Sequence, residues 1–83
     1  MNGKLINKVK KYLKSDGIFK NKQKIKEIIN HPDLTEEERW LIYYTYGEDR
    51  YIINTAIKLN MSERRFYMVQ DKALIKLYYI LKL

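Results

Sequence analysis

The chain has 83 residues, of which 46% are hydrophobic and 33% charged, and its formal net charge is +7. A chain of this size forms one small domain, near the lower limit at which a single hydrophobic core suffices. Three glycines and one proline are too few for a β fold with many turns, and the absence of cysteine excludes disulfides, thiolate metal sites and a cysteine nucleophile. We therefore predict an all-α domain of about five helices, with residues 1–83 as a single unit.

The positive charge is concentrated at the start of the chain. Nine lysines and only two acidic residues, Asp16 and Glu27, precede Asn30, so this segment carries a charge of +7, and the remaining residues have eight cationic and eight acidic side chains. A polyanion is the simplest partner for such a segment, because each neutralised phosphate releases a counterion. The alternative is compositional, since abundant Lys, Asn, Ile and Tyr are typical of adenine- and thymine-rich coding sequences.

The sequence pattern of residues 1–31 predicts a basic segment with two helices. Apolar side chains recur at helical spacing over Leu5–Leu13, with lysines on the opposite side. A turn at Ser15–Gly17 separates this helix from a second one, which His31 and Pro32 end. The inward residues of the second helix are Phe19, Ile25, Ile28 and Ile29. Such helices can lie on an anionic membrane surface, but so small a domain needs their apolar stripe for its core, and we expect core packing.

The next helix is predicted over Leu34–Tyr46. Thr35 and Glu38 have the spacing of a capping box, in which a hydroxyl and a carboxylate each accept from a backbone amide. Glu36 and Glu37 suit the positive end of the helix dipole, so capping explains the acidic cluster without a catalytic or Mg²⁺ site. We expect Leu41, Ile42 and Tyr44 to pack inward and Trp40 and Tyr43 to lie at the boundary.

The stretch Asp49–Leu77 has the pattern of a helix-turn-helix. Asp49 is expected to cap the first helix. The apolar positions of that helix are Ile52, Ile53, Ala56 and Leu59. Ala56 is small enough for close approach of the two helices, and Asn60 readily adopts the left-handed backbone of a tight turn. Ser62 is then expected to cap the second helix.

The second helix of this motif has distinct inward and outward faces. Its inward stripe consists of Phe66, Val69, Ala73 and Leu77. Its outward face consists of Glu63, Arg64, Tyr67, Met68 and Asp71. In a helix-turn-helix, the outward N-terminal residues of the second helix enter the major groove of DNA. The same spacing also fits an ordinary helical hairpin with a solvated outer face.

Beyond Ala73 the last helix is apolar on more than one face. The apolar residues there include Leu74, Ile75, Tyr78, Tyr79 and Leu83. One neighbouring helix cannot bury all of them, so either the N-terminal helices or a second subunit must cover this tail. We expect both to contribute.

No enzyme or membrane protein is indicated. The longest apolar run, near Trp40–Tyr46, is far shorter than the ~20 residues of a membrane span. Lysines interrupt Met1–Asp16, where a signal peptide has its apolar centre, so we expect a cytoplasmic protein. His31 is the single histidine and lacks the partners of a metal ligand or a general base, so we expect neither catalysis nor a metal or other cofactor.

Two protein families share features with residues 34–81. The run LTEEER, then Leu41, Ile42 and Tyr46, then AIKLNMSERRF and finally Lys72, Ala73, Leu74, Lys76 and Leu77 resembles the fourth region of bacterial sigma factors. Residues 60–81, with SERRFY and KALIKLYYIL, more closely resemble the ArpU-type transcriptional regulators, which are sigma-region-like proteins of phages and prophages in low-GC Gram-positive bacteria. The chain departs from the sigma pattern at Thr55, usually aliphatic, and at Asn60, usually glycine. The lysine-rich first thirty residues match neither family.

The resemblance implies a DNA-binding transcription regulator of phage or prophage origin, with a sigma-region-four-like segment at 34–83 and a recognition helix that begins at Ser62. It places Glu63, Arg64 and Met68 against base edges, and Arg65 and Tyr67 against phosphates. Arg64 suits a bidentate contact to guanine, and Glu63 can accept from cytosine. The DNA-binding residues predicted in this way are Ser62, Glu63, Arg64, Arg65, Tyr67, Met68, Asp71 and Lys72.

Our leading hypothesis is therefore recognition of double-stranded DNA. A different class of function is a protein adaptor that binds RNA polymerase or another regulator through the apolar C-terminal helix. A homodimer could form through that same tail. Salt distinguishes these hypotheses, because binding to phosphates weakens steeply as salt rises and an apolar contact does not.

Overall fold

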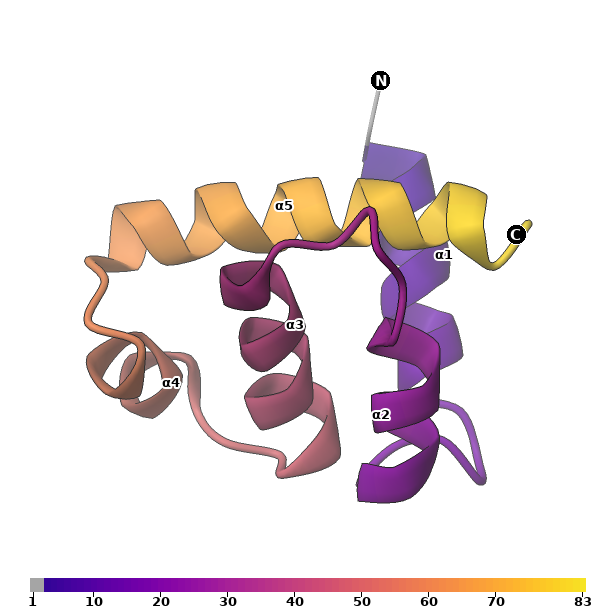
Figure 1. Cartoon of the computed structure of the whole chain (residues 1–83), viewed down its shortest axis with the longest axis horizontal. Coiled ribbons are helices and arrows are strands. Elements are labelled where there is room, and N and C mark those ends of the chain that lie inside the picture. Colours follow the sequence, from indigo (N-terminus) through magenta and orange to yellow (C-terminus); the bar gives the residue numbers. More distant parts are fainter. Residues whose placement is uncertain (1–2) are drawn as a thin grey trace.

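The computed structural model describes residues 3–83 as a set of packed helices (Figure 1). In chain order these are α1 (Gly3–Leu13), α2 (Lys22–Ile29), α3 (Glu36–Ile42), the π-helical turn η1 (Tyr43–Gly47), α4 (Ile52–Lys58) and α5 (Glu63–Ile80). The described residues contain no strand, and α5 is the longest helix, which confirms the predicted all-α class and its long last helix. No helix within this part of the chain is long and apolar enough to cross a membrane.

Helix α5 packs against three of the other helices. It spans one side of the molecule, and α1, α3 and α4 all contact it (Figure 1). The predicted inward stripe of α5, Phe66, Val69, Ala73 and Leu77, is buried. Fully buried side chains from the other helices complete the core, namely Val9, Leu13, Ile25, Leu41 and Ile42. The apolar periodicity of the sequence therefore identified the face of α5 on which the core is built.

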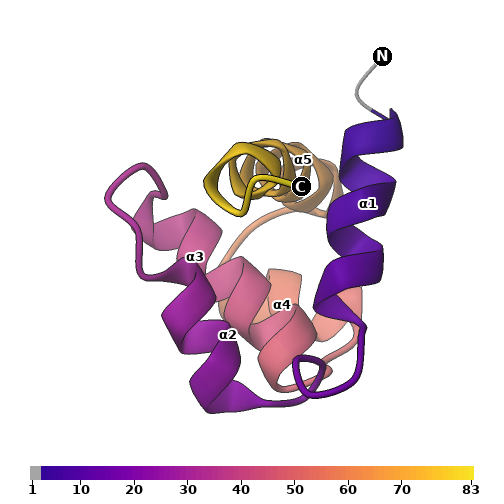
Figure 2. The same ribbon diagram turned by 90° about the vertical axis from the view of Figure 1, so that its right-hand side faces the viewer.

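The apolar tail of α5 is covered chiefly from within the chain. Figure 2 shows α5 end-on with α1 next to it and crossing it steeply, and Leu74 and Leu77 are fully buried. Tyr78 and Leu83 are partly buried, and the Lys8 ammonium donates to the Leu83 carbonyl over 3.3 Å. The expected contribution of the N-terminal segment is confirmed. Of the five apolar tail residues named above, Leu74, Ile75, Tyr78, Tyr79 and Leu83, only Tyr79 is exposed.

The predicted helix caps are present at Thr35 and Ser62. The Glu38 amide donates to the Thr35 hydroxyl over 3.1 Å, and the Thr35 amide donates to the Glu38 carboxylate over 2.8 Å, which completes the capping box. The Ser62 hydroxyl accepts from the Arg65 amide over 3.1 Å. Asn21 caps α2 in the same way, a role that we did not predict.

Three local predictions were wrong, and one apolar position of the first motif helix, Ile53, lies outside the core. Asp49 does not cap α4, because it lies before the helix with φ +53° and its carboxylate pairs with Lys20 at 3.3 Å; α4 begins after Tyr51 without a side-chain cap. Ile53 is 65% exposed, because α4 turns Thr55 and Ala56 toward the core instead. Tyr43 is buried rather than at the boundary. Phe19 precedes α2 and lies in the connection between α1 and α2.

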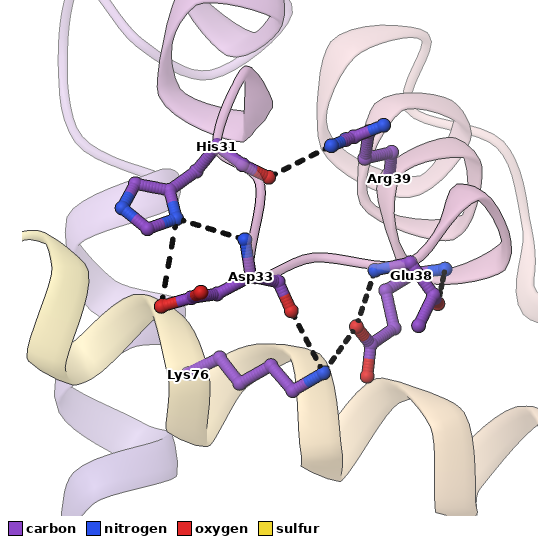
Figure 3. Close-up of polar contacts among 6 residues, drawn as sticks. His31, Asp33, Glu38, Arg39 and Lys76 are labelled. Carbon is purple, nitrogen blue, oxygen red and sulfur yellow. Dashed lines mark hydrogen bonds and ion pairs between the residues drawn. The ribbon is translucent and has the colours of Figure 1, made fainter.

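The connection between α2 and α3 is fastened to α5 by polar contacts (Figure 3). Glu38 is only 4% exposed, and its carboxylate accepts from the Lys76 ammonium over 2.8 Å. Lys76 also donates to the Asp33 carbonyl over 3.0 Å, and Arg39 donates to the His31 carbonyl over 2.8 Å. His31 accepts from the Asp33 amide through Nδ1 over 3.1 Å. These contacts stabilise the loop and the start of α3 against the middle of α5.

Replacement of the buried Thr55 hydroxyl is expected to stabilise the protein. Thr55 is fully buried, and its Oγ1 has no hydrogen-bond partner among the described residues. Replacing Thr55 with Val should raise the free energy of unfolding by about 1 kcal/mol, because a buried unsatisfied hydroxyl is removed. The matched control is Thr35→Val, which should lower it by about 1 kcal/mol because a helix cap is lost. Urea unfolding of both variants measures this, and a destabilised Thr55→Val protein would contradict the assignment.

Removal of the Lys76 ammonium should destabilise the fold. In Lys76→Met the Glu38 carboxylate stays buried without its counter-charge, and we expect a loss of about 1–3 kcal/mol in urea unfolding. Lys72→Met, one turn earlier on α5 and exposed, is the matched control and should change stability by less than about 0.5 kcal/mol. Equal stabilities of the two variants would show that the contact contributes nothing.

Candidate nucleic-acid interface

Helices α4 and α5 form a helix-turn-helix with a tight connection. Asn60 has φ +58°, the left-handed conformation that its position predicted. The Met61 amide donates to the Ala56 carbonyl over 2.9 Å, and Met61 and Ala56 are both buried. In Figure 1 α4 is seen nearly along its axis while α5 runs across the picture, so the two helices cross steeply. The turn therefore leaves the N-terminus of α5 at one end of the molecule.

The predicted DNA-binding residues share one property, which is exposure to solvent. All eight of them, from the cap Ser62 to Lys72, are exposed. Tyr67 is 43% exposed and Met68 52% exposed, so this face offers apolar as well as charged groups. The outward face of α5 is thus the one that the sequence predicted.

Arg65 differs from the other seven because it is already in an ion pair. Its guanidinium donates to the Glu37 carboxylate from Nη2 over 2.7 Å and from Nε over 3.4 Å. Glu37 lies in the first turn of α3, so carboxylates of α3 lie beside this side of α5. A contact between Arg65 and a phosphate would require this ion pair to open.

The opposite side of α5 is basic. A surface hollow of about 600 Å³ lies there, and Tyr67 is one of its lining residues. The cationic residues that line it are Lys10, Lys14 and Arg50. The structure therefore brings part of the lysine-rich N-terminal segment beside the outward face of α5, although more than fifty residues separate them in the sequence. We name this hollow, with Lys10, Lys14, Arg50 and Tyr67, the basic flank.

Arg50 and Tyr51 belong to this surface and were not among the predicted site residues. Tyr51 is 79% exposed and also lines the hollow. Their position in the sequence could have identified them as candidate site residues. They immediately precede the first helix of the motif, and that helix crosses the DNA backbone in a helix-turn-helix. Arg50 also donates to the Glu48 carboxylate over 2.6 Å, and this hydrogen bond lowers the pKa of Glu48.

The side chains of residues 3–83 form no group of three or more that could hold a metal ion. The acidic residues at the start of α3 have other partners, since Glu36 pairs with Arg39 at 2.8 Å and Glu37 pairs with Arg65.

Comparison of the chain with known protein families, with curated proteins and with solved structures gave no match. The fold and the exposed surface define a small all-helical domain that contains a helix-turn-helix. A relationship to sigma region four or to the ArpU-type regulators stays a prediction from the sequence.

The ion pair of Arg50 with Glu48 predicts a pH-dependent contribution to stability. Because the pKa of Glu48 is lowered in the folded protein, this contribution is present above the ordinary carboxyl pKa and is lost as the pH falls through the folded-state pKa. Arg50→Gln should therefore raise the Glu48 pKa and destabilise the protein at neutral pH but not in acid.

Side-chain NMR of the glutamates at varied pH measures the pKa of Glu48. Lys58→Gln is the control, since Lys58 acts on Glu48 only by a weaker charge interaction, and it should shift this pKa less. An unchanged pKa in Arg50→Gln would contradict the interpretation.

Proposed function

We propose that this chain binds double-stranded DNA in a sequence-specific manner, as a transcription regulator of phage or prophage origin. The observation that carries the proposal is the exposed outward face of α5 beside the basic flank. In a helix-turn-helix such a face enters the major groove, while the flanking cations bind the phosphate backbone.

Arg64 is the residue to which we assign base recognition. It is exposed on the first turn of α5, and it forms no ion pair within residues 3–83, in contrast to its neighbour Arg65. A free guanidinium can donate two parallel hydrogen bonds to the major-groove edge of guanine. Glu63 and Met68 lie exposed beside Arg64 and complete the surface that would face the bases.

The DNA backbone is expected to follow the basic flank rather than the start of α3. Lys10, Lys14 and Arg50 supply positive charge on one side of α5, whereas Glu37 lies on the other side and already binds Arg65. The positive charge on the first side attracts phosphates, and the carboxylates on the second side offset the attraction of the cations there. We therefore assign phosphate contacts to Lys10 and Lys14 of the basic flank, while Arg50 and Arg65 contribute only after they leave Glu48 and Glu37.

The adaptor and the homodimer have less support. Both were predicted from the apolar C-terminal tail, and α1 covers most of that tail, with Tyr79 remaining exposed. Ile53 and Ile57, 65% and 72% exposed on α4, form a separate apolar surface. The binding of RNA polymerase or of a second copy stays a prediction.

Selection of bound sequences from random duplex DNA tests the proposal, and Arg64→Ala tests the assigned residue. The unsubstituted chain should enrich a common sequence, and Arg64→Ala should bind that sequence about 5- to 150-fold more weakly, the range for one bidentate base contact. Arg64→Lys keeps the charge without the planar fork and should lose most of the discrimination. Failure to enrich any sequence, or equal binding by Arg64→Ala, would overturn the proposal.

The basic flank predicts a change in salt dependence. Replacing Lys10 and Lys14 together with Gln should reduce the slope of log affinity against log salt by about 2, because two phosphate contacts are lost. The matched control replaces Lys4 and Lys82 with Gln. These two lysines are exposed but do not line the flank, so the slope should stay nearly unchanged. Identical slopes for the two double variants, measured by fluorescence anisotropy with duplex DNA, would place the phosphates elsewhere.

A further inference from the structure

A cluster of aromatic rings lies on α3 and η1, apart from the outward face of α5. Trp40 and Tyr44 stack with ring centroids 5.7 Å apart and planes at 25°. Tyr43 packs edge-on against both, at 5.6 Å from Trp40 and 5.5 Å from Tyr44. Tyr43 is buried, whereas Trp40 is 42% exposed. Part of the indole is therefore open to a ligand, on a ring that its two neighbours hold in place.

Cations from three segments surround these rings. The Lys26 ammonium of α2 lies 5.6 Å from the Tyr43 ring centroid. Arg50 and Lys58 each lie 5.2 Å from the centroid of Tyr44. These distances allow cation–π attraction, which draws positive charge onto the same surface as the aromatic groups.

A pocket of about 390 Å³ opens between α2 and α3 beside the exposed indole. Its lining includes Trp40, Tyr43, Lys26, Gln23 and Asn30. The rings offer a stacking surface, Lys26 offers a positive charge, and the two amides offer both donors and acceptors. This volume lies in the range of small-ligand sites in proteins. We name this site the Trp40 pocket.

The acidic residues of this pocket are engaged by neighbouring groups. Glu36 accepts from Arg39 over 2.8 Å and from the Trp40 indole nitrogen over 3.2 Å. Glu27 lies 4.0 Å from the Lys24 ammonium. Helix α2 carries three lysines and one glutamate, so the α2 side of the pocket has a net positive charge, whereas the two cations and two carboxylates of the lining balance each other. On the α2 side, positive charge therefore lies near the exposed aromatic ring, which suits an anionic ligand that contains flat aromatic groups.

We propose that the Trp40 pocket binds an unpaired base of single-stranded nucleic acid. The base stacks on the Trp40 indole, and the adjoining phosphates bind Lys26 and its neighbours on α2. Proteins that bind single strands combine these two features, aromatic side chains for the bases and a basic surface for the backbone. A base within a duplex is stacked on both faces and cannot enter the pocket. This site does not depend on the duplex-binding function proposed for α5.

Trp40 is the only tryptophan in the chain, so its fluorescence reports directly on the pocket. The full chain is titrated at low salt with short oligothymidylate and oligouridylate, which distinguish a DNA strand from an RNA strand. Saturable quenching by at least one of them, weakening as salt rises, is expected. No quenching by either strand, or equal quenching by duplex DNA of the same length, would overturn the proposal.

Substitutions then separate stacking from simple charge attraction, with labelled oligonucleotide as the probe. Trp40→Ala should weaken binding about tenfold, the loss expected for one base–aromatic stack, and Trp40→Phe should restore most of it. Lys26→Glu should also weaken binding and reduce the salt slope. Since Lys26 is exposed, that variant also tests the pocket if Trp40→Ala fails to fold.

Tyr79→Ala is the matched aromatic control, because Tyr79 is 67% exposed on α5 outside the pocket. It should bind single strands as the unsubstituted chain does. Arg64→Ala should likewise leave single-strand binding unchanged, so failure of the Trp40 pocket and failure of the duplex site give different results. Equal affinities of Trp40→Ala and Tyr79→Ala would contradict base stacking on Trp40.

Discussion

The buried carboxylate of Glu38 connects the parts of this fold. It accepts from the Thr35 amide at the start of α3 and from the Lys76 ammonium on α5, each over 2.8 Å. A carboxylate that is 4% exposed loses most of its hydration, and these two hydrogen bonds replace it. One side chain thus takes part both in the cap of α3 and in the contact of α3 with α5. The direction in which the N-terminal half of α5 faces solvent depends on this junction.

The same arrangement places different charged groups beside the two sides of α5. Because α3 is anchored by its first turn, its acidic N-terminus lies against α5, where Glu37 binds Arg65. Helix α1 packs on α5 as well and brings Lys10 and Lys14 to the other side, beside Tyr67. The net charge of α5 alone therefore says less about the charge around it than the residues of the neighbouring helices do. Packing thus brings lysines that are distant in the sequence close to α5. This supports the proposed binding of DNA along one side of α5.

Local chemistry allowed much of this fold to be predicted from the sequence. The caps at Thr35 and Ser62 and the left-handed Asn60 depend on residues within a few positions of each other, and all three predictions were confirmed. Contacts between distant segments were not predictable in this way. Asp49 has the right chemistry for a cap but pairs with Lys20, and the predicted phosphate contact Arg65 is engaged by Glu37, twenty-eight residues away. The Trp40 pocket likewise exists only because α2 packs beside α3.

We propose that duplex DNA lies across the outward face of α5 and the basic flank. Backbone amide chemical shifts of isotope-labelled protein, recorded with and without a bound duplex, test it most directly because every segment is observed at once. We expect the largest changes at residues 63–71 of α5, at Lys10 and Lys14, and around Arg50. Changes confined to α2 and the Trp40 pocket, or an absence of changes on α5, would contradict the account.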